Sequence, residues 1–285
     1  MNENSSAGKR SARERLQQQR QREHAREKRR RALLVTAAVV GVLGLAAVVG
    51  VLAANSGGDD GDSAAGPVVA PSGAVGDDRL IIPVGASDAP STLTVWEDFR
   101  CPACAFFETT YRDTIHELTD SGQIKVEYRL ATIIDGNMGG SGSLNAANAA
   151  ACAQDAGRFV PYHDVLFQNQ PMETDDAFSN NQTLFDLAGK VQGLDTPAFR
   201  SCVADGTHKA WANESNEAFL AGDFRGTPTV LLNGEPIFPA KGGEQISPEN
   251  LKKWVTEANQ GKQPGTATPT GAATATGTPT ASPAG

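Results

Sequence analysis

The stretch TLTVWEDFRCPACAFFETTYRDTI, residues 92–115, holds two of the chain's four cysteines where two kinds of local structure meet. Thr92–Phe99 is rich in β-branched and aromatic residues, which predicts a strand. From Pro102 to Asp120 the apolar residues recur at helical spacing, and a Ser-Gly pair then ends the predicted helix. Cys101 therefore ends a strand, and Cys104 lies one turn into the helix that follows.

The sequence around this junction predicts one α/β domain over residues 79–260. Strands are expected at 79–84, 92–99 and 124–134, and again at 226–234 and 235–240, where an Asn-Gly turn joins the last pair. Ala-rich and amphipathic runs predict a helical insert at about 140–222, with helices near 143–156, 159–168, 182–191, 196–204 and 208–221. Ser247 is a typical N-cap for a final helix that ends near Ala258. The predicted order is βαβ, helical insert, ββ and α.

The chain before this domain predicts a membrane anchor. Residues 32–54 carry no charge, and 23 residues at about 1.5 Å each can cross a hydrocarbon core of about 30 Å. Residues 1–31 contain 11 Lys/Arg and 4 Asp/Glu, whereas the rest of the chain has a net charge of −15. The positive-inside bias then places residues 1–31 in the cytoplasm against membrane lipid, and the domain outside the cell membrane. A cleaved signal peptide is the alternative, although the basic segment before the apolar core of a signal peptide is rarely this long.

Two further segments have a composition that does not favour a packed core. Residues 55–78 are rich in Gly, Ser, Ala, Asp and Pro and are expected to form a flexible linker. Residues 261–285 are rich in Thr, Pro and Ala and are expected to form a disordered tail, of the kind that is often O-glycosylated. The basic run has no aromatic residues to stack on bases, which argues against nucleic acid as a partner.

The position of Cys101 and Cys104 favours redox chemistry. The first turn of a helix has unpaired N–H groups and the positive end of the helix dipole, which stabilise a thiolate. A lowered cysteine pKa raises the fraction of thiolate, which is the nucleophile. At this spacing the two sulfurs can form a small disulfide, in which Cys101 is attacked and Cys104 resolves the mixed disulfide.

Two other interpretations of this pair compete with a redox centre. A structural zinc site needs four ligands, usually in two close pairs, and the remaining cysteines are 50 residues apart. We therefore expect no metal and no cofactor. An inert clip is the second alternative, but so short a loop removes little entropy from the unfolded chain.

Cys152 and Cys202 both fall in the predicted helical insert. An even number of cysteines outside the cytoplasm favours pairing, and one of three connectivities leaves the CxxC pair intact. We expect a permanent Cys152–Cys202 disulfide that holds the insert together.

Together, WEDFRCPAC, the helical insert and the later GTPTVLLNG resemble the DsbA-like branch of the thioredoxin superfamily, and in particular its membrane-anchored actinobacterial members. This resemblance covers about residues 79–259. It implies a thioredoxin fold, Cys101 as the attacking thiol with Cys104 as its partner, and Pro228 as a cis-proline beside them. The backbone of Thr227 would then pair with an extended substrate.

The sequence departs from the family pattern at two positions. Strong oxidases of this family often have His before the second cysteine, where this chain has Ala103. Many members have a buried acid six residues before the first cysteine, where this chain has Val95. Glu97 shares the strand parity of Val95, but we interpret it as an ordinary strand residue rather than as a proton relay.

The expected function is an extracytoplasmic, membrane-anchored thiol–disulfide oxidoreductase that exchanges its disulfide with cysteines of secreted or cell-envelope proteins. The oxidase direction is favoured, and the resemblance implies a quinone-linked membrane thiol oxidase as electron acceptor. A reductase or isomerase of the same fold is one alternative. A redox-inactive thioredoxin-like binding module is another.

Overall fold

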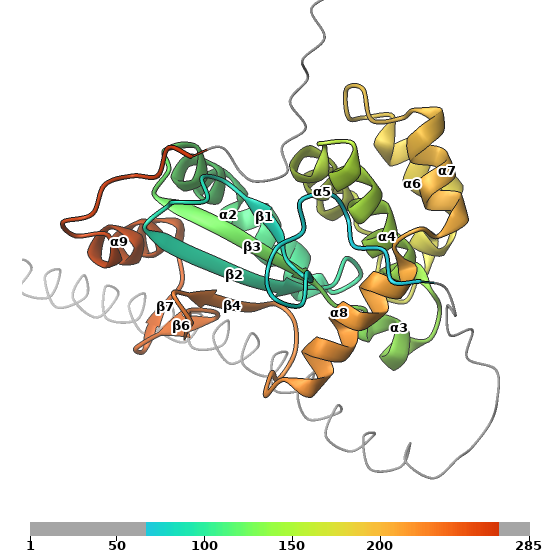
Figure 1. The fold of residues 1–285 in the computed structure, drawn as a ribbon. Helices are drawn as coiled ribbons and strands as arrows, with labels where there is room; N and C mark the ends of the chain where they lie inside the picture. The colour runs from blue at the N-terminus through green and yellow to red at the C-terminus, as the bar shows by residue number, and fades with distance from the viewer. Residues whose placement is uncertain (1–66, 268–285) are drawn as a thin grey trace, which may run out of the picture. The chain divides into compact units, whose positions relative to one another are not determined.

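The computed structural model describes residues 67–267, and a five-stranded mixed sheet lies at their centre (Figure 1). Its spatial order is β1-β3-β2-β4-β5, with bounds Ile82–Val84 (β1), Ser91–Glu97 (β2), Ile124–Leu130 (β3), Thr229–Leu232 (β4) and Glu235–Pro236 (β5). β2 pairs with β3 in parallel, and the other neighbours pair antiparallel. A parallel pair needs a long crossover, which here is α2, Pro102–Asp120.

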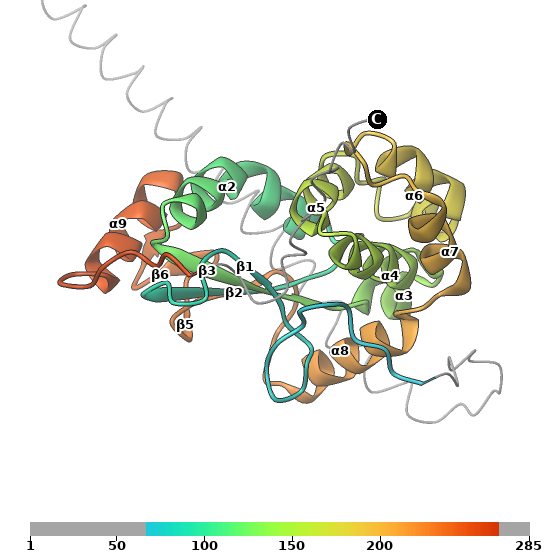
Figure 2. The ribbon, with the colours of Figure 1, turned by 45° about the horizontal axis from the view of Figure 1, so that its top comes forward.

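Helices cover both faces of this sheet. α2 and α9 (Pro248–Ala258) lie on one face, and α8 (Lys209–Ala221) lies on the other (Figure 2). The helical block stands beyond one end of the strands and consists of α3 (Ile133–Met138), α4 (Gly142–Asp155), α5 (Phe159–Gln168), η2 (Ala177–Ser179), α6 (Asn181–Ala188) and α7 (Pro197–Asp205). The chain therefore has the predicted thioredoxin-like α/β fold with a helical insertion.

The core follows from the alternation of the strands and the apolar stripe of α2. β3 buries every second residue, from Ile124 to Leu130, and polar residues occupy the positions between them. The buried face of α2 packs against this surface through Cys104, Phe107, Tyr111, Ile115 and Leu118. Six of the 14 residues of α4 are alanine, and all six are completely buried, which lets α5 and α7 pack closely around it.

Most of the predicted elements are confirmed, and the Asn-Gly hairpin is the sharpest case. Asn233 and Gly234 have φ angles of 51° and 84°, and Leu232 pairs with Glu235 across the turn. These two positive φ angles are those of a type I′ turn.

Two of the predicted strands end four residues earlier than the sequence suggested. The strand predicted over 124–134 stops at Leu130, because α3 begins at Ile133 and the carboxylate of Asp98 accepts the N–H of Ile134 in its first turn. The strand predicted over 235–240 stops at Pro236, and the Phe238–Pro239 bond after it is cis. A small hairpin, β6 (Ala240–Lys241) with β7 (Glu244–Gln245), follows and was not predicted.

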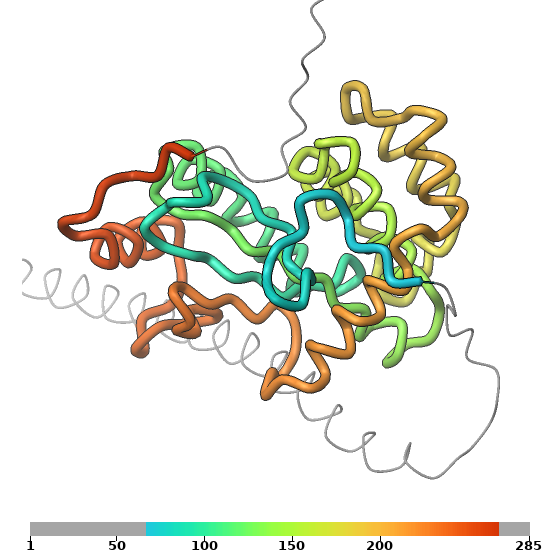
Figure 3. The backbone as a smooth tube through the Cα atoms, in the orientation of Figure 1, coloured from blue at the N-terminus to red at the C-terminus, as the bar shows by residue number. Residues whose placement is uncertain are grey.

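Residues at both ends of the described chain contact the domain. The blue start of the chain in Figure 3 runs beside the helical block, where Ser72 N–H donates to Asp155 at 2.7 Å. At the other end, Gly265 N–H donates to the carbonyl of Gly122 at 2.8 Å. The part of the predicted linker after residue 66 and the start of the predicted tail therefore pack on the domain.

The predicted basic segment 1–31 and the predicted membrane helix 32–54 lie outside the described residues. Within residues 67–267, no helix combines the length and the apolar character that crossing a bilayer requires.

Candidate active site

Cys101 is the N-cap residue of α2, and Pro102 occupies the first position of the helix. Its sulfur lies 3.3 Å from the carbonyl oxygen of Thr227, and only 7% of the residue is exposed. β2 ends at Glu97, so Cys101 follows the loop 98–100 rather than ending the strand as predicted. Its side chain lies where α2 directs its free N–H groups and the positive end of its dipole, and the predicted position at the start of the helix is confirmed.

Cys104 lies one turn further along α2 and is completely buried. Both cysteines are free thiols, so the structure represents the dithiol state of the pair. The thiol of Cys104 hydrogen bonds to Cys101, and this bond is the largest cause that lowers the pKa of Cys101 to about 7. Burial raises the pKa of Cys104 well above its usual range. The structure thus divides the pair into one ionisable nucleophile and one protonated partner.

The Thr227–Pro228 peptide bond is cis, which places the loop before β4 against the cysteine pair. Proline has no N–H, and the backbone carbonyl of Thr227 is directed at the Cys101 sulfur. The sequence placed these two residues at the site only through the family resemblance, and the geometry brings them together with Cys101.

Asp98 connects the cysteine loop to the start of the helical block. Its carboxylate accepts the N–H groups of Arg100 and Ile134 at 2.8 and 2.9 Å, and its own N–H points at the sulfur of Cys104 at 3.5 Å. Burial raises the pKa of Asp98 to about 6. A charge on this carboxylate opposes a thiolate on Cys101, so the two groups are electrostatically coupled.

Arg100 ties the same loop to the helical block. Its guanidinium is buried and lies 2.6 Å from Asp135 and 3.0 Å from Asp176, and it donates to the carbonyls of Gly139 and Glu173. The planar guanidinium group has five N–H donors and can therefore bind all four acceptors at the same time.

Gln170, from the segment after α5, holds the backbone of the cysteine loop from a second side. Its side-chain amide donates to the carbonyls of Phe99 and Cys101 at 2.8 and 2.9 Å. The insert therefore fixes the backbone that carries the nucleophile.

A cluster of three buried ionisable residues lies behind the cysteine pair. Glu97 is completely buried and its carboxylate is 3.0 Å from Nε2 of His163, so it is not the ordinary strand residue that the sequence suggested. Glu108, one turn after Cys104 on α2, is also buried. One oxygen of each carboxyl group has no hydrogen-bond partner among the described residues.

The charge state of this cluster follows from its surroundings. Burial raises the pKa of Glu108 well above its usual range. Burial alone would lower the pKa of His163, but the charge of Glu97 holds it well above its usual range. The ligand atoms of the three residues lie within 4.8 Å of one another, a set that a divalent ion can use. A proton shared between the two carboxyls accounts for their unpaired oxygens without an ion.

We did not predict a role at the site for Gln170, His163 or Glu108 from the sequence. Each comes from a segment far from the cysteine pair or carries no motif of its own. The single available signal was the charge of Glu108 on the apolar stripe of α2, since charged residues are rarely buried without a partner.

Cys152 and Cys202 are joined by a disulfide that links α4 to α7, 50 residues apart in sequence, which is the pairing the sequence suggested. It lies inside the helical block and supports the elements from which Gln170 and Asp135 reach the cysteine loop.

A CxxC pair at the start of the helix after a central strand, with a cis-proline opposite, defines a thioredoxin-like thiol–disulfide oxidoreductase. A family model described as thioredoxin matches residues 79–257. The chain belongs to this thioredoxin family.

Among proteins of this family, the chain is similar to several disulfide bond formation proteins. Disulfide bond formation protein D of Bacillus subtilis is 25% identical over 157 residues, which is 54% of this chain and 68% of the relative. DsbG from Mycobacterium tuberculosis has a TM-score of 0.55 and 27% identity, covering 70% of this chain and 95% of that structure. Reduced DsbA from the same organism has a TM-score of 0.54 and 25% identity, covering 65% and 94%. These similar proteins are DsbA-like thiol–disulfide oxidoreductases.

Proposed function

We propose that this protein oxidises cysteine pairs in secreted or cell-envelope proteins and works outside the cytoplasm. The observation that carries the proposal is the unequal pair at the start of α2, with Cys101 ionising at a pKa of about 7 and Cys104 held protonated. Compared with an ordinary thiol, the stabilised Cys101 thiolate favours the dithiol form and supplies the nucleophile for exchange. The oxidising direction of the proposal rests on similar proteins that are named disulfide bond formation proteins.

The exchange takes two steps. A substrate thiolate attacks the sulfur of Cys101, a bond forms between the two sulfurs, and the Cys101–Cys104 bond breaks. Cys104 leaves as a thiolate and takes up a proton, as its buried position requires. A second substrate thiolate then attacks the substrate's own sulfur, Cys101 leaves as a thiolate, and two electrons remain on the protein as the dithiol.

The backbone around Cys101 supports binding of an extended substrate. The carbonyl of Thr227 faces the nucleophile, and the cis bond to Pro228 presents this edge without an N–H from the proline. Substrate main chain added along this edge would place its cysteine at Cys101. The relatives' function as disulfide bond formation proteins is consistent with such substrates.

The membrane part of the proposal rests on the sequence. The uncharged residues 32–54 after a basic segment would anchor the domain, which raises its effective concentration for membrane partners. The reduced protein needs an electron acceptor, and a quinone-linked membrane thiol oxidase has the required chemistry.

One observation favours the alternative, in which the protein reduces or isomerises disulfides. A pKa of about 7 for the nucleophile is close to that of thioredoxin and well above the value of about 3.5 in the strong oxidant DsbA. Ala103 offers no imidazole to lower it further. A reductase or isomerase role is therefore the second candidate.

The oxidase proposal is tested by oxidative refolding of a reduced, unfolded protein with several cysteines. We expect the oxidised full chain to accelerate recovery of the native substrate, and Cys101→Ser to abolish the effect. Cys104→Ser, mixed with a substrate that already carries a disulfide, should accumulate a mixed disulfide on Cys101, because the Cys101 thiolate displaces one substrate sulfur and no Cys104 thiol is present to resolve the bond; mass spectrometry detects this adduct. A redox-inactive binding module would lose nothing in Cys101→Ser, and that result would exclude the enzymatic function.

A further inference from the structure

Asp98 is a buried carboxylate that has no cationic partner within residues 67–267. The residue is completely buried, and its oxygens accept the backbone N–H groups of Arg100 and Ile134 at 2.8 and 2.9 Å. The guanidinium of Arg100 is only two residues away, but it is directed at Asp135 instead. Backbone N–H groups hold a carboxylate in place without neutralising its charge, so the negative charge of Asp98 acts on its other neighbours.

The nearest of these neighbours are the two active-site cysteines. The carbonyl of Asp98 accepts the N–H of Cys101 at 3.0 Å, and its own N–H lies 3.5 Å from the sulfur of Cys104. Cys101 is almost completely buried, so solvent screens little of the interaction between a thiolate there and the carboxylate. The hydrogen bond from Cys104 lowers the pKa of Cys101, and the charge of Asp98 acts in the opposite direction.

The other charged groups around Asp98 do not remove this repulsion. Asp135, on α3, adds a second negative charge and is paired with Arg100. Glu97, the preceding residue, directs its carboxylate at His163 on α5. Burial is the largest cause that raises the pKa of Asp98 to about 6, and the charge of Asp135 adds to it. Asp98 therefore takes up a proton just below neutral pH, and its repulsion of a Cys101 thiolate then ends.

We propose that Asp98 is a positioning residue of the exchange reaction, which lowers the oxidising power of the Cys101–Cys104 disulfide at neutral pH and no longer does so once it is protonated. The proposal rests on the thiol–disulfide chemistry of this pair and not on the direction of exchange.

The reaction shows where the proton of Asp98 enters. When a substrate dithiol reduces the pair, the substrate's two sulfurs form a disulfide, and two electrons break the bond between Cys101 and Cys104. Two protons leave the substrate, and Cys104 takes up one of them. The second goes to Cys101, to Asp98 or to solvent. Uptake by Asp98 lets Cys101 remain a thiolate without a negative charge beside it, which stabilises the dithiol form.

The test compares the full chain with its Asp98→Asn variant in glutathione buffers from pH 5 to pH 8. Asparagine keeps the shape of the side chain and one acceptor oxygen, but it carries no charge. At pH 8 we expect the variant's equilibrium to lie about tenfold further toward the dithiol, which corresponds to a potential about 30 mV higher. At pH 5 this difference should be lost, because Asp98 of the wild type is then protonated. The pH midpoint for iodoacetamide alkylation of Cys101 should fall by about one unit.

Asp113→Asn is the matched control, because it removes a carboxylate from α2 whose side chain is 89% exposed. It should leave the potential unchanged at both pH values. The proposal is overturned if folded Asp98→Asn matches its parent at pH 8, or if the two differ equally at pH 5 and pH 8.

A measurement on the wild type decides the question if circular dichroism shows that Asp98→Asn has not folded. Carbon-13 NMR of the carboxyl groups should give a higher titration midpoint for Asp98 in the dithiol than in the disulfide, since only the dithiol carries a thiolate. Equal midpoints overturn the proposal. The absolute potential of the wild type tests the direction of exchange, whereas these differences test Asp98, so either can fail without the other.

Discussion

The contact between the two active-site thiols allows us to predict how the pKa of Cys101 changes when Cys104 is replaced. The hydrogen bond from Cys104 is the largest cause that lowers the pKa of Cys101 from 9.0 to about 7. At about 1.36 kcal/mol per pKa unit, the whole shift represents about 2.7 kcal/mol in favour of the thiolate. Cys101 is almost completely buried, so solvent does little to screen these interactions.

Cys104→Ala removes this donor, whereas Cys104→Ser keeps a hydroxyl that can donate in its place. We expect the alanine substitution to raise the pKa of Cys101 by at least about one unit, since other contacts, including Thr227, remain. The thiolate fraction at neutral pH then falls from about one half to about one tenth, and the serine variant lies between the wild type and the alanine variant.

The assay is the rate of iodoacetamide alkylation of Cys101 as a function of pH, with each modified site identified by peptide mapping. The wild-type dithiol is the reference, and circular dichroism shows whether each variant is folded. Identical midpoints for the alanine and serine variants and the wild type would refute the assigned role of Cys104. A wild-type midpoint near 9 would refute the lowered pKa itself.

Three further predictions concern stability. Replacing Cys152 and Cys202 by Ala should cost about 4 kcal/mol in denaturant unfolding, because the bond closes a loop of 50 residues. The pKa of His163 is higher in the folded protein than in the unfolded chain, so its protonation stabilises the fold. This contribution to the free energy of unfolding is complete below about pH 6.5 and is lost as the pH rises through the folded-state pKa. The free energy of unfolding should therefore decrease from pH 6.5 upward, and His163→Gln should flatten this slope. Arg100→Met should cost about 3–5 kcal/mol in thermal or denaturant unfolding, since it leaves the carboxylate of Asp135 unpaired; an unchanged midpoint would contradict the role given to this ion pair.

The local features of this protein were predictable from its sequence. The spacing of Cys101 and Cys104, the proline between them and the change from strand to helical periodicity all lie within a few residues. The Asn-Gly turn before β5 is similarly local, because two positive φ angles depend on those two residue types.

The partners of the buried charges were not predictable, because they are distant in sequence. Glu97 and His163 are 66 residues apart, and the pair forms only when α5 packs against the end of β2. The end of β3 was predicted too late for a similar reason. The apolar residues 131–134 suit a strand, but the carboxylate of Asp98, 36 residues before Ile134, accepts the N–H of Ile134 at the start of α3.

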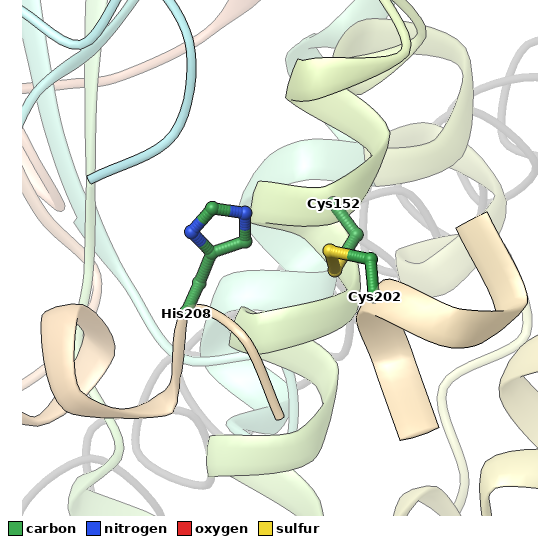
Figure 4. A group of neighbouring side chains, drawn as sticks. All are labelled: Cys152, Cys202 and His208. Carbon is green, nitrogen blue, oxygen red and sulfur yellow. A yellow bond between two sulfur atoms is a disulfide. The ribbon is translucent and has the colours of Figure 1, made fainter. Parts of the chain in front are cut away.

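The contacts of His208, which lies beside the Cys152–Cys202 disulfide (Figure 4), were likewise not predictable from the sequence. Its two ring nitrogens lie 2.8 Å from the carbonyl oxygen of Val69, 139 residues earlier, and 2.8 Å from a carboxylate oxygen of Asp155, 53 residues earlier. A histidine by itself gives no signal for that arrangement, since its role is defined by what each nitrogen faces.

The reduction potential of the Cys101–Cys104 pair tests the central claim most directly. It can be measured by equilibrating the full chain in glutathione buffers and quantifying the dithiol by alkylation and mass. A thiolate-stabilising site used for oxidation predicts a value above roughly −200 mV, toward the range of protein disulfide isomerase and DsbA. A value close to that of thioredoxin, about −270 mV, would contradict the oxidase function and assign the protein to reduction.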